Sequence, residues 1–214
     1  YGLKDFTVAL GYKGEYIKEY FVDYCSLESN LTVNLAAGAV ESHGNRRPDW
    51  NLELIDTGVA TLTGGRIKRL KPYVGNSPFM LTWGDGVSNV DLQKLLKFHQ
   101  SHGRIATVTA VRPAARFGHM IFDGDRVTEF SEKPQAAEGW VNGAFFVLEP
   151  EVFDYIDGDS TQWEKEPMER LAGDGQLMAY RHEGFWQCMD TLRDKVLLED
   201  LWQEGNPPWK TWDD

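Results

Sequence analysis

Asp85 is a candidate ligand for a divalent cation. It lies between Gly84 and Gly86, directly after residues 79–83, an apolar run typical of a buried strand. Ligands of open α/β sheets bind beyond the carboxyl ends of the strands, and flanking glycines let a ligand approach the backbone closely. A carboxylate at this place suits a hard cation. A plain turn that ends the strand is the simpler interpretation, so the tripeptide alone leaves both open.

Asp190 is the second carboxylate of interest. It lies in the segment 184–191, immediately before a predicted helix, and an aspartate there is more simply explained as an N-cap. Asp85 and Asp190 are far apart in the chain, so their spacing cannot show whether they meet.

Two further segments carry groups that could bind phosphate. Residues 61–66 combine hydroxyls, Gly64-Gly65 and Arg66, and such a loop can present amides and a guanidinium to a phosphate or a base edge. A turn before a basic helix face explains it equally well. Lys133 precedes a proline, which favours an extended backbone and a projecting side chain, although a solvated loop lysine is the simpler interpretation.

Other patterns do not support a site. His99 and His102 have i, i+3 spacing, but no cysteine or carboxylate cluster accompanies them in the sequence, which favours a satisfied or exposed pair over zinc. Residues 157–159 lack the ligand rhythm of an EF-hand, and neither a G-x-S-x-G motif nor a complete P-loop is present.

The charge balance excludes one class of partner. The 214 residues contain 22 Lys and Arg against 33 Asp and Glu, a net charge of −11, and such an acidic surface repels nucleic acid. A small anionic ligand would need a local cluster of cations, amides or a bridging metal. No apolar run approaches the ~18 residues of a membrane span. Cys25 and Cys188 cannot form a disulfide framework, so we expect a cytoplasmic protein. The acidic charge and the lack of a long apolar run lead us to expect that it binds neither nucleic acid nor membrane.

The pattern of apolar residues predicts an α/β fold. A strand at 6–10, a helix whose face carries Ile17, Tyr20, Phe21 and Tyr24, and a strand at 31–35 open the chain, the order typical of parallel strands. Residues 36–58 look polar and irregular. Further predicted elements are strands at 79–83, 105–111 and 144–148, a helix that ends near residue 103, and capped helix starts at residues 161 and 191.

Taken in order, the motifs resemble the sugar-1-phosphate nucleotidyltransferases, in particular the branch that transfers a cytidylyl group, over essentially the whole chain. The matching stretches are G-Y-K-G at 11–14, D-T-G at 56–58 with T-G-G-R at 63–66, G-D-G at 84–86, R-F-G at 116–118, E-K-P at 132–134, N-G-A-F-F at 142–146, F-W-Q at 185–187 with M-D-T at 189–191, and P-W-K-T-W at 208–212.

The resemblance implies a Rossmann-like, mostly parallel mixed sheet flanked by helices and a Mg²⁺-dependent reaction. In this reaction a phosphate oxygen of glucose 1-phosphate attacks the α-phosphorus of CTP, giving CDP-glucose and pyrophosphate. The resemblance implies that CDP-glucose is a precursor of bacterial surface-polysaccharide sugars. Such a transfer depends on positioning and charge neutralisation. Other bases, uridine or thymidine, and a non-catalytic sugar-nucleotide-binding or assembly module stay open as alternatives.

The resemblance also assigns roles to residues. Asp85 and Asp190 match the magnesium pair, and Lys133 joins them as a catalytic residue. The residues that match nucleotide contacts are Thr61, Gly64, Gly65, Arg66 and Gly84. The residues that match the sugar-phosphate side are Gly118, Glu132, Lys133, Asn142 and Gly143.

The chain departs from the family at its start. The glycine-rich G-G-x-G-T-R-L loop and the lysine segment that follows it do not occur, so we expect residues 1–214 to be a nucleotidyltransferase domain without the first strand, phosphate loop and first helix. We therefore expect little activity from the chain as given. Residues 184–214 are expected to form a C-terminal helix and Trp-rich tail, and the family analogy implies a homo-oligomer.

Overall fold

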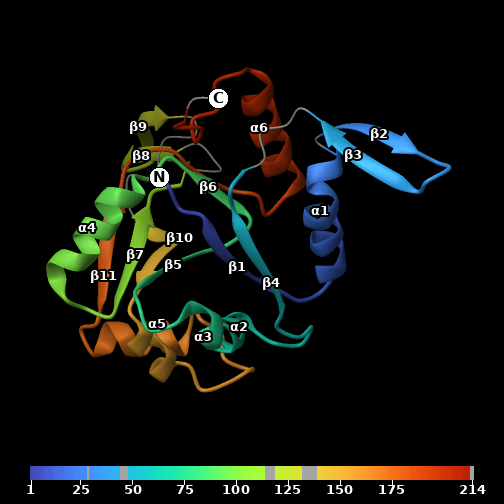
Figure 1. Cartoon of the computed structure of the whole chain (residues 1–214). Coiled ribbons are helices and arrows are strands. Elements are labelled where there is room, and N and C mark those ends of the chain that lie inside the picture. The colour runs from blue at the N-terminus through green and yellow to red at the C-terminus, as the bar shows by residue number, and fades with distance from the viewer. Residues whose placement is uncertain (28, 44–47, 114–118, 132–138, 213–214) are drawn as a thin grey trace. The chain divides into compact units, whose positions relative to one another are not determined.

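The computed structural model describes residues 1–27, 29–43, 48–113, 119–131 and 139–212. The chain forms two compact units, residues 1–76 with 153–169 and residues 77–152 with 170–214. In chain order the elements of Figure 1 are β1 (Asp5–Leu10), α1 (Gly14–Leu27), β2 (Asn30–Asn34), β3 (Ala39–His43), β4 (Asn51–Asp56), α2 (Thr63–Arg69), α3 (Lys71–Val74), β5 (Phe79–Thr82), β6 (Gly86–Ser88), α4 (Leu92–His102), β7 (Ala106–Val111), β8 (His119–Asp123), β9 (Arg126–Ser131), β10 (Val141–Leu148), the 3-10 helix η1 (Pro150–Tyr155), α5 (Glu166–Gly173), β11 (Leu177–His182), β12 (Trp186–Cys188) and α6 (Leu192–Gln203).

In the first unit β1 pairs in parallel with β4, with Leu10 opposite Asp56. The expectation that residues 31–35 follow the first helix as a strand is confirmed, but this strand, β2, pairs with β3 in an antiparallel hairpin whose residues are all exposed. The Asn34 side chain closes the turn by accepting hydrogen bonds from Ala36 N and Ala37 N. The parallel partner β4 comes from the stretch that the sequence analysis took as irregular.

Helix α2 packs closely against the loop 158–161 of the same unit. Arg69 donates two hydrogen bonds to the Asp159 carboxylate, at 2.8 and 2.6 Å. This pairing lowers the pKa of Asp159 and raises that of Arg69. The capped helix start expected at Thr161 is wrong: its hydroxyl accepts from Gly158 N to close the loop, and α5 begins at Glu166.

The second unit is built on a mixed four-stranded sheet in the order β11-β7-β10-β5. β7 is parallel to β11 and antiparallel to β10, and all six of its residues are buried, as its β-branched sequence predicts. Helix α4 begins with the Asp91 carboxylate accepting from Lys94 N and ends at Gly103, whose φ of 61° is left-handed. The mixed α/β class expected from the sequence is thus confirmed.

The C-terminal tail is anchored by one of its tryptophans. Trp209 packs against Trp202 of α6 and Phe185, with ring centroids 6.5 and 5.6 Å apart, whereas Trp212 is exposed. Within the described ranges, no helix is both long and apolar enough to cross a membrane.

The approach of α2 to the 158–161 loop yields a stability prediction. A Cβ at Gly65 would lie 2.5 Å from Asp159 Cα and 2.6 Å from its carbonyl oxygen, backbone atoms that cannot move aside. Gly65→Ala should therefore lower the free energy of unfolding by about 1–3 kcal/mol, despite the better helix propensity of alanine. The matched control is Gly158→Ala, whose Cβ would meet no described heavy atom within 4 Å. Equal urea midpoints for the two variants would contradict the prediction.

Candidate active site

The turn between β5 and β6 presents Asp85 to solvent. Asp85 is exposed, and β5 ends at Thr82. A Cβ added at Gly84 or Gly86 would have no described heavy atom within 4 Å, so the backbone on both sides of the carboxylate is open to a ligand. The position fits the expectation of a carboxylate beyond the end of a strand.

Asp190 leaves the adjacent strand at the same end. β6 pairs with β12, with Gly86 opposite Cys188, and Met189 N donates to Asp85 O at 2.7 Å. One residue further along, Asp190 follows Met189. The structure therefore brings together two aspartates that the sequence could not place relative to each other.

The simpler interpretation of Asp190 as a helix cap is wrong. Thr191 is the N-cap of α6: its hydroxyl accepts from Asp194 N, and the Asp194 carboxylate accepts from Thr191 N, which completes a capping box. The Asp190 carboxylate instead accepts a weak hydrogen bond from Cys188 Sγ at 3.4 Å. Burial and this carboxylate raise the pKa of Cys188, so its thiol stays protonated.

Asn142 and Gly143 begin β10 beside the same turn. Phe145 of β10 lies opposite Thr82 of β5, so β10 starts at the end of the sheet where β5 runs toward Asp85. The register of β10 shifts here, Ala144 has a φ of 58°, and Asn142 Oδ1 holds the bulge by accepting from Ala144 N at 2.8 Å. A non-glycine residue in this conformation is strained, and such strain concentrates at functional sites.

Trp186 connects the bulge to the strand that carries Asp190. Its indole Nε1 donates to Gly143 O at 2.8 Å. Sequence reasoning missed this residue as a positioning group, although the F-W-Q stretch that contains it carried part of the family resemblance. Asp85, Asp190, Asn142 and Gly143 thus gather at one edge of the second unit.

In the first unit, the backbone N–H groups of Gly64 and Gly65 form hydrogen bonds within the chain. Both N–H groups donate to Thr161 O, at 2.9 and 3.3 Å. A Cβ at Gly64 would lie 2.9 Å from that same oxygen, so both glycines serve the close approach of α2 to its neighbour. Thr61 is buried nearby. Their assignment as nucleotide contacts stays a prediction.

Arg66 joins the carboxyl ends of β1 and β4. Its Nη1 donates to Leu10 O at 2.9 Å and to Thr57 Oγ1 at 2.7 Å, while Thr57, fully buried, donates to Leu10 O. A Cβ at Gly11 would lie 2.3 Å from Arg66 Nη2, so glycine lets the guanidinium lie on the backbone. Its role toward a nucleotide stays a prediction. Three predicted residues of the sugar-phosphate side, Gly118, Glu132 and Lys133, lie outside the described residues.

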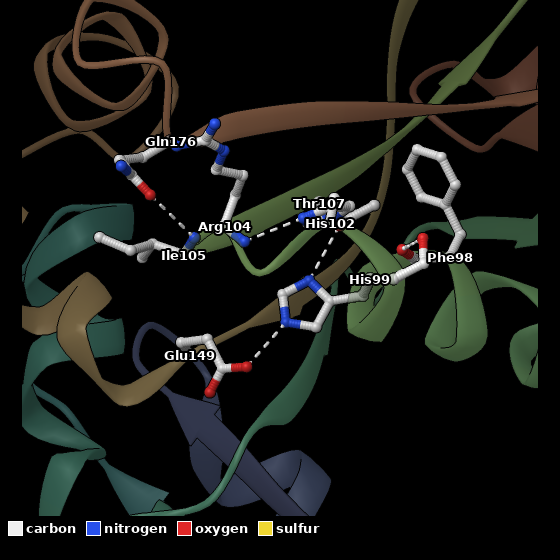
Figure 2. Close-up of polar contacts among 9 residues, drawn as sticks. Phe98, His99, His102, Arg104, Ile105, Thr107, Glu149 and Gln176 are labelled. Carbon is white, nitrogen blue, oxygen red and sulfur yellow. Dashed lines mark hydrogen bonds and ion pairs between the residues drawn. The ribbon is translucent and has the colours of Figure 1, made fainter.

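His99 and His102, for which the sequence did not favour zinc binding, both contact the hydroxyl of Thr107 (Figure 2). His99, at 1% exposure, contacts Thr107 Oγ1 at 2.9 Å through Nδ1 and Glu149 Oε1 at 3.2 Å through Nε2. His102 Nε2 contacts the same hydroxyl at 2.7 Å, and Arg104 N donates to His102 Nδ1 at 3.0 Å.

These contacts fix the direction of the hydrogen bonds. Since Arg104 N is a donor, His102 Nδ1 must accept, and neutral His102 then donates from Nε2 to Thr107. The carboxylate of Glu149 only accepts, so His99 Nε2 donates to it and His99 Nδ1 accepts from the Thr107 hydroxyl. The histidines therefore join α4 to β7 and to the end of β10.

The donor set at the aspartates fits magnesium. Among the described residues, no group of three or more His, Cys, Asp and Glu side chains is placed to hold a metal ion. Mg²⁺ does not require such a cage, because it commonly binds one or two carboxylates and completes its shell with water and substrate phosphates. Asp85 and Asp190, exposed at the same end of β6 and β12, meet that requirement.

Comparison with known proteins identifies the family. The profile of the family described as Nucleotidyl transferase matches residues 61–199. The glucose-1-phosphate cytidylyltransferase of Salmonella typhi is 49% identical over 214 residues, all of this chain and 83% of that protein. The chain belongs to the nucleotidyltransferase family. A probable glucose-1-phosphate cytidylyltransferase of Bacillus subtilis is 43% identical over 99% of this chain and 83% of its own length.

A solved structure shares the fold of this chain. The crystal structure of HddC from Yersinia pseudotuberculosis superposes with a TM-score of 0.61 at 17% identity, covering 92% of this chain and 77% of that one. At that identity the likeness concerns the fold alone. The expected family and α/β architecture are therefore both confirmed.

The histidine network of this nucleotidyltransferase predicts a pH dependence of stability. Burial lowers the pKa of His102, and charge repulsion from His99 and Arg104 lowers it further. The unfolded chain then binds more protons, so stability should be full above about pH 6.5 and fall as the pH drops toward the folded-state pKa. Urea midpoints between pH 5.5 and 8 measure this.

The variant His102→Asn keeps an acceptor for Arg104 N and removes the titrating ring. Its midpoint should vary less with pH than that of the wild type. The control is His43→Asn, which replaces an exposed histidine of β3. Parallel curves for the wild type and His102→Asn would remove the assigned cause.

Proposed function

We propose that this protein transfers a cytidylyl group from CTP to glucose 1-phosphate, forming CDP-glucose and pyrophosphate. The observation that carries the proposal is the identity of 49% over the whole chain with a glucose-1-phosphate cytidylyltransferase. The meeting of Asp85 and Asp190 beside an open glycine turn supports it from geometry. A phosphate oxygen of glucose 1-phosphate attacks the α-phosphorus of CTP, and the bond to the β-phosphate oxygen breaks to release pyrophosphate.

The reaction brings two anions together, and the protein must offset their repulsion. Asp85 and Asp190 are proposed to hold Mg²⁺, which supplies positive charge to the phosphates when bound. Nucleotidyltransferases of this family generally use a divalent metal. Both carboxylates are exposed and lie at the same end of one strand pair, which supports their binding a common ligand.

Asn142 and Gly143 are proposed to bind the sugar phosphate together with Gly118, Glu132 and Lys133. The side-chain oxygen Oδ1 of Asn142 accepts the hydrogen bond that holds the bulge, so the side-chain nitrogen Nδ2 is the group that remains to donate to a ligand. The indole of Trp186 fixes Gly143 O and keeps the bulge in place. The proposed sugar-phosphate contacts therefore depend on a backbone conformation that β12 supports.

The nucleotide side is proposed to include Thr61, Gly64, Gly65, Arg66 and Gly84. Arg66 is held by Leu10 O and Thr57, which places its charge at the carboxyl ends of β1 and β4. Because the Gly64 and Gly65 amides bond to Thr161 O, these glycines would serve a nucleotide by close approach and not as amide donors.

The base preference is tested by product formation. The protein as its gene encodes it, supplied with glucose 1-phosphate and MgCl₂, should form CDP-glucose with CTP and far less product with UTP, dTTP or GTP. Mass spectrometry of the nucleotide sugars and pyrophosphate release are the measurements. Equal yields with another nucleotide would reassign the base, and no product with any of them would favour the binding module.

The aspartates are tested by conservative replacement. Asp85→Asn and Asp190→Asn should each reduce kcat by about 100-fold or more, because an amide loses the charge that binds the metal. The unfolding midpoints should change little, since both side chains are exposed. The matched control Glu199→Gln removes an exposed carboxylate of α6 and should keep full turnover. Unchanged turnover in both aspartate variants would remove the metal assignment.

A further inference from the structure

A fully buried threonine binds the guanidinium of Arg66 in the first unit. Thr57 directly follows β4, and its hydroxyl oxygen lies 2.7 Å from Arg66 Nη1 and 2.7 Å from Leu10 O. An arginine can only donate, so the hydroxyl accepts from Arg66 and donates its own proton to Leu10 O. Arg66 Nη1 also donates to Leu10 O, at 2.9 Å. Both protons of Nη1 are therefore bound at the carboxyl ends of β1 and β4.

Gly11, the first residue after β1, makes room for the same guanidinium. A Cβ at Gly11 would lie 2.3 Å from Nη2, 2.4 Å from Nη1 and 2.6 Å from Cζ of Arg66, so the guanidinium occupies the space that a side chain would take. Nη2 also reaches Val59 O at the longer distance of 3.4 Å. Arg66 is therefore fixed by the backbone on one side and by the Thr57 hydroxyl on the other.

These contacts leave part of the guanidinium available to a ligand. Arg66 is half-buried, and its Nε and one N–H of Nη2 form no hydrogen bond with the residues that the structure describes. None of the described carboxylates pairs with Arg66 either. A half-buried charge without a counter-ion favours the approach of an anion, and the edge formed by Nε and Nη2 can bind two oxygens of one phosphate. This geometry suits the proposed place of Arg66 on the nucleotide side.

We infer that Thr57 is the positioning residue for Arg66 in the binding of CTP. This inference rests on the proposed function, in which Arg66 contacts the nucleotide. An arginine side chain has many rotamers, and fixing it in one of them before the ligand arrives lowers the entropic cost of binding. The hydroxyl can be removed without leaving Leu10 O unpaired, because that oxygen also accepts from Thr57 N at 2.8 Å and from Arg66. Its removal therefore acts mainly on the position of Arg66.

Thr57→Val removes the hydroxyl and keeps nearly the same shape. Calorimetry should show that CTP with MgCl₂ binds about threefold to tenfold more weakly, the range of one hydrogen bond, while the affinity for glucose 1-phosphate stays within about twofold. In turnover assays KM for CTP should rise more than kcat falls. Thr57→Ser, which keeps the hydroxyl but loses a buried methyl group, should lower the urea midpoint and still bind CTP within about twofold of the wild type.

A double-mutant cycle shows whether Thr57 acts through Arg66. Arg66→Gln should weaken CTP binding by about tenfold or more. Adding Thr57→Val to that variant should change the affinity by less than about twofold, because the two side chains act as one unit. Gly11→Ala moves Arg66 by a second route, since the three heavy atoms nearest to the new Cβ all belong to its guanidinium. This variant should also weaken CTP binding by about threefold or more.

The matched control is Thr109→Val. Thr109 is a threonine of β7 that is as fully buried as Thr57, but its hydroxyl has no hydrogen-bond partner among the described residues. The same substitution there should leave the affinities for CTP and for glucose 1-phosphate unchanged. The control thus separates the loss of a positioning hydrogen bond from the general effect of replacing a buried threonine.

Separate outcomes distinguish this inference from the proposed function. Wild-type protein that forms CDP-glucose, together with Thr57→Val that retains wild-type affinity for CTP, would overturn the inference alone. An equal loss of affinity for both ligands would also overturn it, because that result marks a general structural role, and so would a full additional loss from Thr57→Val in the Arg66→Gln background. Wild-type protein that neither binds CTP nor forms CDP-glucose would overturn the function on which the inference rests.

Discussion

The pairing of β6 with β12 is the contact on which the candidate site depends. Each strand is only three residues long, and the hydrogen bond from Met189 N to Asp85 O extends the ladder to the point where both aspartates leave it. Short strands hold position only when their ends are fixed. Here the capping box at Thr191 fixes the chain after Asp190, and the indole of Trp186 fixes β12 to the start of β10. The metal candidates and the two described sugar-phosphate candidates, Asn142 and Gly143, are therefore positioned by one local framework.

β7 gives the second unit its rigid centre. Its first half contacts α4 through Thr107, which the two histidines share, and its last residues lie between Val141 of β10 and His182 of β11. Every residue of β7 is buried and paired with β11, and all but Thr109, which faces the bulge of β10, are also paired with β10. A strand held in this way fixes the elements packed on both of its sides.

In the first unit, glycines and an arginine of the kinds that could bind phosphate take part in packing. A loop with Gly-Gly and arginine resembles a phosphate cradle in the sequence, but hydrogen-bond donors go to whichever acceptor the fold brings close. The Thr161 carbonyl takes the two glycine amides, and the Leu10 carbonyl and Thr57 take the guanidinium. A similar choice of partner occurs at the start of α6. Thr191 is the N-cap of this helix, so Asp190 is not used as the cap.

The sequence by itself determined the elements with strong local patterns and the family. The apolar runs at 79–83, 105–111 and 144–148 and the helix that ends before Gly103 are local signals, and the order of short motifs identified a nucleotidyltransferase. It failed where partners are distant. Residues 31–35 form a strand but pair with β3, while β1 pairs with β4, because strand partners are chosen by tertiary packing and not by alternation. Only the fold decided that Asp85 meets Asp190 and that Arg112 and Arg181 share Trp140, since each depends on strand pairing between segments remote in the chain.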